Sequence, residues 1–542
     1  MDILFAENSK KETIQLKPET IKDLGLNEVL ENITEGEKEM LIVKDIITKI
    51  PSDIADIRYR QEIMKDFLDN EELTQSFSDA IWQIKTLKDY SNSLSLTLQK
   101  DNSLYVLLEF LRELNIYVNV LEELKKCLEN ENVNSTGLKK LFETINKVIS
   151  DEEFEETKKD INKMLEEMSS VQGAIVGVNF TPELDIEQVS VVEFVPYKLR
   201  SKYKFAEIAA SLGLIINSPA SSNQGGKPGV VTPVRTADPL LVNMTPQIEK
   251  HLKRHFTKIK TVMSKYITFD ATFMTEMYEG LTFYLAMAKF ANRLKKDGFE
   301  ICLPELSDKE DISVNSFSIK DLYNVRLFFA DEKNIVKNDL SFSPKERMYI
   351  LTGPNRGGKT IIEQAVGIIS IMAASGAFVT ANECKGRPFT NILTHFPIDE
   401  NLTINYGRLG EEAVRIKEIV KEADANTLIL FNETYSTTSA QDGLYLSKDL
   451  LKILKETGSA LIFNTHIHEV ARSIDEINTW PGKSDCVSLV MEIKNNVNTF
   501  KVKRSEPDSK SYARNIAEKY GITYEQMKED KSNYFLPHEM TK

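Results

Sequence analysis

The sequence contains few cysteines and no long apolar run. Its four cysteines, Cys127, Cys302, Cys384 and Cys486, lie far apart and share no paired spacing. This pattern argues against a zinc site or a disulfide framework and fits a reducing cytoplasm. No apolar stretch is long enough to span a membrane, and the first residues lack the basic segment and apolar core of a signal peptide.

Positively charged residues are also fewer than negatively charged ones. The formal net charge is −14, with 68 Lys and Arg against 82 Asp and Glu. The surface as a whole should therefore repel nucleic acid, and any contact with a phosphate backbone must come from local basic patches. The remaining composition is ordinary for a globular protein, and a chain of 542 residues should form about two to four domains.

The N-terminal part of the chain is predicted to be helical almost throughout. Between about residues 17 and 170, glycine and proline are nearly absent, and apolar residues recur at three- and four-residue spacing. Residues 174–180 and 189–194 then predict two strands around a turn centred on Pro182. Residues 276–294 predict a further long helix, whose methionine and aromatic residues we interpret as core.

Basic residues gather in residues 198–204, where a tyrosine is interleaved, and in a predicted helix that begins near Thr245. A loop rich in Ser, Gly, Pro and Asn, residues 217–239, separates the two. The helix has two interpretations: a surface that contacts a phosphate backbone, or a solvated basic face that balances the acidic chain. The candidate nucleic-acid contacts are Lys250, Lys253, Arg254 and Lys258.

From about residue 323 the pattern changes to strands and helices in alternation. Strands are predicted at 325–329, 348–351, 427–431 and 460–464, with helices between the later ones. Such alternation is typical of a mostly parallel sheet covered by helices. Residues 487–493 and 498–503 predict a terminal hairpin around Asn495-Asn496, and a short helical segment is expected from Ser511.

A glycine-rich motif joins the apolar strand at 348–351 to a predicted helix at 361–374. It has the P-loop spacing Gly353-x-x-x-x-Gly358-Lys359-Thr360. Glycines let successive backbone N–H groups point at a phosphate chain, and the helix adds its N-terminal partial charge. Lys359 would reach the β- and γ-phosphates of ATP, and the Thr360 hydroxyl would ligate Mg²⁺.

Two later strands end in polar side chains that suit the same site. Asn432-Glu433 follows the apolar residues 428–431, so Glu433 is placed to act as a general base for water. Asn432 stands where an Asp usually helps to hold the metal, so we expect weaker Mg²⁺ binding and slow turnover. His466 follows the strand at 461–463 and is a candidate γ-phosphate sensor, and Gln364 lies one turn into the P-loop helix.

These motifs, in this order and at compatible spacings, resemble the MutS family of DNA mismatch-repair ATPases, within the broader ABC-type ATPases. The resemblance is strongest from about residue 334 to 521. The matching segments are 353–359, 375–379, Asn432-Glu433, 438–443, 465–469 and Ser511-Tyr512 with Ile516-Ala517. The implied fold is an α/β P-loop ABC-type ATPase domain preceded by a mostly α-helical core, lever and clamp region. The expected divisions are 1–172, 173–315, 316–520 and 521–542.

The resemblance implies ATP and Mg²⁺ as cofactors. The expected catalytic residues are Glu433, His466 and Lys359, and the expected metal ligands are Thr360 and Asn432. The expected nucleotide-binding residues are Gly353, Pro354, Asn355, Arg356, Gly357, Gly358, Lys359, Thr360 and Gln364.

The sequence also departs from the family pattern. After Gly407-Arg408 the family has Ser-Thr, but Leu409-Gly410 stand here, and the start leaves no room for a mismatch-recognition domain with its Phe-x-Glu wedge. We therefore expect a cytoplasmic, nucleoid-associated ATPase that forms homodimers through its ATPase domains and binds mismatched or structured DNA in repair or recombination. The alternative is a nucleotide-dependent binding switch with little turnover, acting on branched nucleic acid, a ribosome or a protein partner.

Overall fold

The computed structural model describes two compact units of the chain. The described residues are 2–97, 104–130, 133–169, 173–183, 186–198, 272–307, 316–332, 334–397, 408–436, 438–495, 497–506 and 520–528. One unit comprises Ser76–Asn130 and Lys140–Tyr278, and the other comprises Asp2–Gln75, Glu131–Lys139 and Glu279–Lys542. The predicted loop at 217–239, the basic helix with Lys250, Lys253, Arg254 and Lys258, and Ser511–Ala517 lie outside the described residues.

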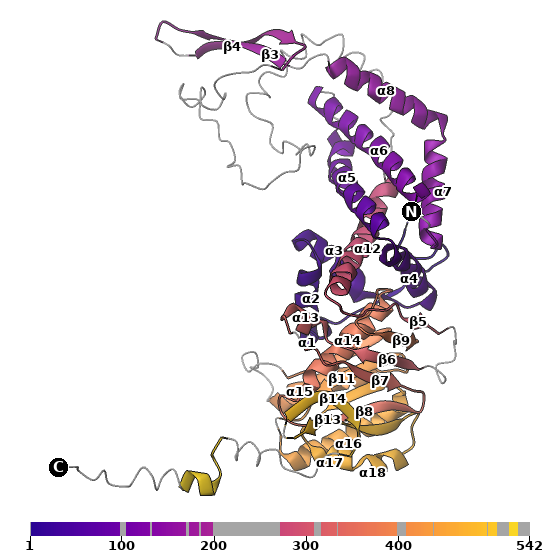
Figure 1. Cartoon of the computed structure of the whole chain (residues 1–542), viewed down its shortest axis with the longest axis vertical. Coiled ribbons are helices and arrows are strands. Elements are labelled where there is room, and N and C mark those ends of the chain that lie inside the picture. Colours follow the sequence, from indigo (N-terminus) through magenta and orange to yellow (C-terminus); the bar gives the residue numbers. More distant parts are fainter. Residues whose placement is uncertain are drawn as a thin grey trace, which may run out of the picture. The chain divides into compact units, whose positions relative to one another are not determined.

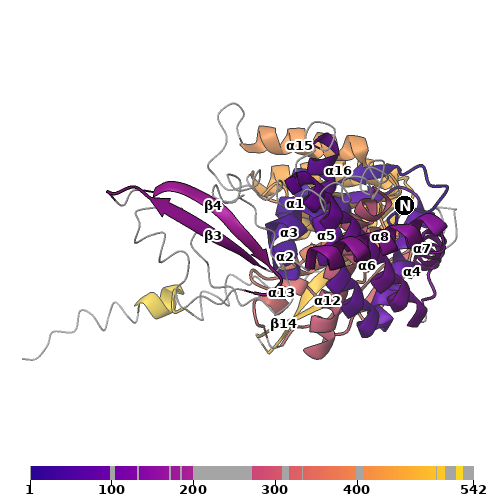
Figure 2. The same cartoon turned by 90° about the horizontal axis from the view of Figure 1, so that it is seen from above.

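The first unit is built from long helices and a hairpin, as predicted. Its helices are α5 (Glu71–Thr97), α6 (Leu104–Asn130), α7 (Thr136–Ile149) and α8 (Glu152–Ser169). Buried leucines at positions 111, 114, 121 and 124 of α6 repeat at helical spacing, which explains why this segment forms an amphipathic helix. Strands β3 (Gly173–Phe180) and β4 (Ile186–Val195) pair antiparallel and form the two-stranded ribbon seen in Figure 2.

The second unit contains a six-stranded sheet in the order β10-β11-β12-β8-β13-β14. Figure 1 labels its strands β11, β8, β13 and β14. The strands are β10 (Asn391–His395), β11 (Thr427–Asn432), β12 (Ala460–Asn464), β8 (Glu346–Thr352), β13 (Asp485–Lys494) and β14 (Val497–Arg504). All neighbours pair parallel except β13 and β14, which form the predicted hairpin with Asn495 at a φ of 51°. The predicted mostly parallel sheet is confirmed. Strands β10, β11, β12 and β8 are buried along most of their length, as expected for a sheet with helices on both faces, whereas the edge strand β14 is mostly exposed.

Helices cover the two faces of this sheet with different sets of side chains. Ile429 and Phe431 pack in one core with α15 (Arg408–Glu422), α16 (Ala440–Thr457), α17 (His468–Arg472) and α18 (Ile474–Thr479). On the other face, α14 (Lys359–Ala374) lies against Leu430, because a Cβ added at Gly367 would be 2.9 Å from its Cδ1 atom. Since side chains alternate along a strand, Asn432 faces α14 together with Leu430.

The first helices of the chain belong to the same unit as the sheet. They are α1 (Pro18–Asp23), α2 (Leu26–Ile33), α3 (Glu37–Thr48) and α4 (Ile54–Asp69), with the short strands β1 (Thr13–Gln15) and β2 (Lys49–Pro51) pairing nearby. Thr20 of α1 donates a hydrogen bond to the Ile392 carbonyl of β10 at 3.1 Å, and Arg60 of α4 is buried. Residues 2–75 thus pack with the C-terminal sheet, while the four-part division remains a prediction.

One predicted strand is wrong. Residues Val325–Phe329 form a short helix, α13, because the Asn324 side chain accepts a hydrogen bond from the Arg326 N–H at 2.9 Å and caps it. The strands nearby are β6 (Phe317–Leu322) and β7 (Asn338–Phe342), which join β5 (Glu305–Leu306) and β9 (Glu383–Gly386) in a second sheet. The predicted helix at 276–294 is confirmed as α12 (Thr272–Lys296), and its Met277, Phe283 and Tyr284 are buried.

None of the helices in the described part of the chain combines the length and the apolar character that crossing a membrane requires.

Candidate nucleotide-binding site

The P-loop turns tightly between the buried strand β8 and the N-terminus of α14. Gly353 and Gly358 have φ values of 143° and 94°, and Arg356 has a φ of 62°. A Cβ at Gly353 would lie 2.8 Å from the Met491 Cβ, so only glycine fits there without movement of the neighbouring strand. The loop therefore has the backbone shape of a phosphate-binding cradle, and the first N–H groups of α14 open into it.

Lys359 is folded back over this loop. Its side chain is 5% exposed, and Nζ donates hydrogen bonds to the Gly353 and Pro354 carbonyls, both at 3.1 Å. Burial lowers the pKa of the Lys359 ammonium, while the carboxylates of Glu433 and Glu363 oppose that shift. The loop thus keeps a cation at the place where a polyphosphate would need one.

Thr360 and Asn432 meet at the edge of the sheet, as predicted. The Thr360 hydroxyl donates to Asn432 Oδ1 at 3.3 Å. Asn464 lies opposite Asn432 in the parallel register of β11 and β12, and its Nδ2 donates to the same Asn432 oxygen at 2.6 Å. Asn432 is therefore held by two donors, and its orientation is set from both the P-loop helix and the neighbouring strand.

Glu433 and His466 also converge, from the ends of two adjacent strands. His466 Nε2 donates to Glu433 Oε1 at 2.8 Å, and both side chains are more than a third exposed. This hydrogen bond lowers the pKa of the Glu433 carboxyl group, whereas partial burial opposes the shift. Glu433 has a φ of 52°, and its N–H donates to the Asn464 carbonyl at 2.9 Å. A non-glycine residue in this left-handed region is uncommon, and such residues cluster at functional sites.

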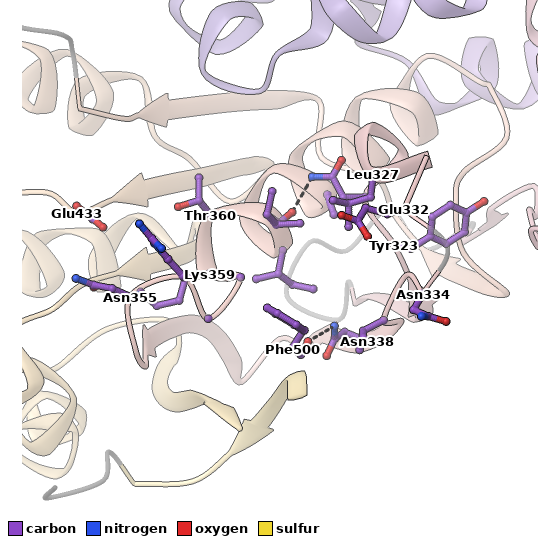
Figure 3. A pocket seen from close by; sticks show the side chains of 18 residues that line it. Tyr323, Leu327, Glu332, Asn334, Asn338, Asn355, Lys359, Thr360, Glu433 and Phe500 are labelled. Atoms are coloured by element: carbon purple, nitrogen blue, oxygen red, sulfur yellow. Dashed lines mark hydrogen bonds between the residues drawn. The ribbon is translucent and has the colours of Figure 1, made fainter. Parts of the chain in front are cut away.

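A cavity of about 460 Å³ extends from this edge of the sheet. In Figure 3, Asn355, Lys359 and Glu433 lie at one end, and Tyr323 and Asn334 lie at the other. The walls combine the P-loop with residues from α13, the segment before β7, and β14: Asn324, Leu327, Glu332, Val336, Asn338, Ile361, Ile362, Ala365 and Phe500. The mixture of apolar walls and a few amide groups suits a planar heterocycle attached to a phosphate chain.

The Asn338 side chain holds one wall of this cavity in place. Its Nδ2 donates to the Phe500 carbonyl at 3.0 Å, and its Oδ1 accepts from the Val502 N–H at 2.7 Å. Both hydrogen bonds hold the hairpin strand β14 against β7, which keeps the Phe500 side chain beside the P-loop. Sequence patterns gave no role to this hairpin, because its contacts with β7 bridge about 160 positions of the chain.

Gln364 lies apart from the other predicted site residues. Its Nε2 donates to the Asp23 carbonyl at 2.9 Å, and its Oε1 accepts from Arg326 Nη1 at 3.0 Å. Gln364 is not among the residues that line the cavity. Its predicted role in nucleotide binding remains a prediction, while its contacts in the structure join α14 to α1 and α13.

Sequence reasoning missed two buried side chains beside the predicted metal ligands, Thr360 and Asn432. Asn464 ends its strand as Asn432 does, and Glu363 is the acidic residue that follows Thr360 by one helical turn. Asn464 Nδ2 also approaches Glu363 Oε2, at 3.4 Å. Burial raises the pKa of the Glu363 carboxyl group well above its usual range. The sequence signal that could have identified Glu363 is its charge, because the rest of α14 is mostly apolar.

The residues present fit a magnesium ion that arrives with a nucleotide. Among the described residues, no group of three or more His, Cys, Asp or Glu side chains is arranged to hold a metal by itself. Mg²⁺ bound with nucleotides takes one or two protein ligands and completes its shell with phosphate oxygens and water. Thr360 and Asn432 provide two oxygens beside the cradle, and buried Glu363 Oε1 and Asn464 Oδ1 lack hydrogen-bond partners.

Comparison with known proteins identifies this architecture. The family model for MutS domain V matches residues 349–533, which include the C-terminal ends of all six strands of the large sheet, and the model for the MutS2 N-terminal domain matches residues 52–193. The chain belongs to the MutS family. The family resemblance inferred from the motifs is confirmed.

Three relatives illustrate the extent of the similarity. Endonuclease MutS2 of Clostridium botulinum (strain Okra / Type B1) is 27% identical over 237 residues, 42% of this chain and 28% of the relative. DNA mismatch repair protein MutS of Shouchella clausii (strain KSM-K16) is 27% identical over 194 residues, 36% and 22% of the two chains. DNA mismatch repair protein MutS of Staphylococcus haemolyticus (strain JCSC1435) is 30% identical over 175 residues, 32% and 19% of the two. This MutS family chain therefore matches less than a third of each relative's length.

Proposed function

We propose that this MutS family protein binds ATP with Mg²⁺ at the P-loop edge of its sheet and hydrolyses it. The observation that carries the proposal is the convergence of three strand ends. Lys359, Thr360 and Glu433 line one cavity, and Asn432 and His466 are hydrogen-bonded to Thr360 and Glu433. Family members are ATPases that use ATP with Mg²⁺, which supports the same ligand here.

Each side chain has a separate task in this proposal. The P-loop N–H groups and Lys359 hold the β- and γ-phosphates, and the adenine ring of ATP occupies the cavity beside Phe500. Thr360 and Asn432 hold Mg²⁺, which neutralises charge on the phosphates. Glu433 accepts a proton from the attacking water, and His466 orients the Glu433 carboxylate through their hydrogen bond.

Asn432 sets the expected rate of this reaction. A neutral amide replaces a carboxylate at the end of β11, and both donors to its oxygen would fit an Asp equally well. The test is steady-state phosphate release with Mg²⁺ by the full chain and by Asn432→Asp. We expect slow hydrolysis by the wild type and faster hydrolysis by the variant. Binding of ATP without turnover in both proteins would instead support the nucleotide-dependent switch.

We propose further that the protein acts on DNA in repair or recombination and dimerises through its ATPase unit. The family membership and the names of the relatives support the first point. Exposed apolar side chains on α15, Leu409 and Val414, support the second. The test is a panel of perfect duplex, mismatched duplex, branched junction and RNA, read by binding and by ATPase rate, with mass measured in the presence of ATP. No stimulation by any DNA, and a monomer with ATP, would reject both points.

A further inference from the structure

Glu363 is a buried acid for which the proposed reaction has no role. It lies one turn after Thr360 in α14, its side chain is 0% exposed, and Oε2 accepts from Asn464 Nδ2 at 3.4 Å. The other oxygen, Oε1, is buried without a hydrogen-bond partner. Burying a carboxylate with so few partners is costly, so a purely structural position would favour an apolar residue, as at neighbouring Ala365 and Val366.

A chain of side-chain contacts connects this acid to the proposed metal ligands. Asn464 Nδ2 lies between Glu363 Oε2 at 3.4 Å and Asn432 Oδ1 at 2.6 Å. Asn432 Oδ1 in turn accepts from the Thr360 hydroxyl at 3.3 Å. Asn464 is also buried, and its own Oδ1 lacks a partner. Two buried oxygens without a hydrogen-bond partner, one on Glu363 and one on Asn464, therefore belong to the side chains behind the proposed metal ligands.

The geometry explains why these groups meet. Asn432 and Asn464 are register partners on β11 and β12, so their side chains point to the same face of the sheet. α14 covers that face, and residues three apart in a helix share one side, so Thr360 and Glu363 both face the two asparagines. Asn432 itself carries no negative charge, and the buried carboxyl group of Glu363 comes from the helix opposite it.

We propose that Glu363 is a positioning residue for Mg²⁺. Ionised when the cation is bound, its carboxylate supplies from the P-loop helix the negative charge that Asn432 does not carry. It acts through Asn464, which joins the Glu363 carboxylate to Asn432. This inference rests on the proposed binding of Mg²⁺ and ATP. Carboxylates behind the direct ligands of a metal hold those ligands in place, and their loss costs about 10- to 100-fold in metal affinity.

The test compares the full-length wild type with Glu363→Gln and with the double variant Glu363→Gln/Asn432→Asp. The readout is binding of a fluorescent ATP analogue, first in EDTA and then over a series of Mg²⁺ concentrations. Glu363→Gln should raise the Mg²⁺ concentration for half-maximal binding about 10- to 100-fold, while affinity in EDTA changes less than about threefold. Retained affinity in EDTA also shows that the variant is folded. The double variant should recover most of the lost Mg²⁺ affinity, because it restores one carboxylate to the same cluster of side chains.

Exposed Glu456 on α16 provides the matched control, and Glu456→Gln should leave both affinities unchanged. An unchanged Mg²⁺ requirement in Glu363→Gln would show that Glu363 is only structural and would overturn the inference. If the double variant does not recover the Mg²⁺ requirement of the wild type, the inference is also overturned, because a carboxylate at position 432 then cannot replace the one at position 363. A wild type that binds no ATP, with or without Mg²⁺, would reject the proposed function itself and this inference with it.

Discussion

Replacing Lys359 by methionine removes the P-loop cation but keeps a side chain of similar length. An ammonium group has three donors, and in the structure two of them are used by the Gly353 and Pro354 carbonyls at 3.1 Å. One donor is left for phosphate. A hydrogen bond to a charged group contributes about 1.5 to 3 kcal/mol, so ATP affinity should fall about 10- to 150-fold.

Stability should respond differently from affinity. Burial lowers the pKa of Lys359, which shows that this site disfavours the charged form, and a neutral methionine avoids that cost. The melting temperature without nucleotide should therefore stay the same or rise. The assay is titration calorimetry with ATP and Mg²⁺ alongside thermal unfolding. The control is Lys65→Met, at an exposed position on α4. ATP affinity within threefold of the wild type would refute the assignment of Lys359 to phosphate.

Three further predictions follow from the described residues and from the predicted basic helix. Glu433→Gln should lower phosphate release about 100-fold or more while ATP affinity is kept; a smaller loss would remove Glu433 as the base. Burial lowers the pKa of His395 from 6.5 to about 4. The unfolded chain alone takes up a proton in that window, so stability should fall by about 3 kcal/mol as the pH drops from 6.5 to 4. In urea unfolding, His395→Gln should flatten this dependence, and an unchanged slope would contradict it. Reversing the charges of Lys253 and Arg254 should reduce the salt dependence of DNA binding, and an equal slope would exclude that helix.

Much of the site could be predicted because its signals are local. The P-loop is one continuous segment, and the strands that end at Asn432 and His466 are short apolar runs followed by polar residues. Parallel strands bring their carboxyl ends to a single edge, so the order of these motifs predicts that they meet. The terminal hairpin was predictable for the same reason, because its turn at Asn495 lies between two β-prone runs.

The errors and omissions involve residues whose state depends on distant neighbours. Residues Val325–Phe329 carry an apolar, β-prone pattern, yet one capping side chain at Asn324 makes them a helix. The nucleotide-binding role of Gln364 stays a prediction. What the sequence did not show is that its amide pairs with the Asp23 carbonyl, 341 positions away. Nothing in the local pattern of either segment predicts those partners.

The amino-acid sequence by itself determined the glycine-rich P-loop turn, the order of the strands that carry polar ends, and membership of the MutS family, because each depends on residues within a few positions of one another. Only the tertiary structure decided that Glu363 and Asn464, 101 positions apart, share a buried cluster behind Asn432. It also decided that residues 2–75 pack around the C-terminal sheet. Those outcomes depend on which helix covers which face of the sheet, and burial of apolar surface across the whole unit sets that choice.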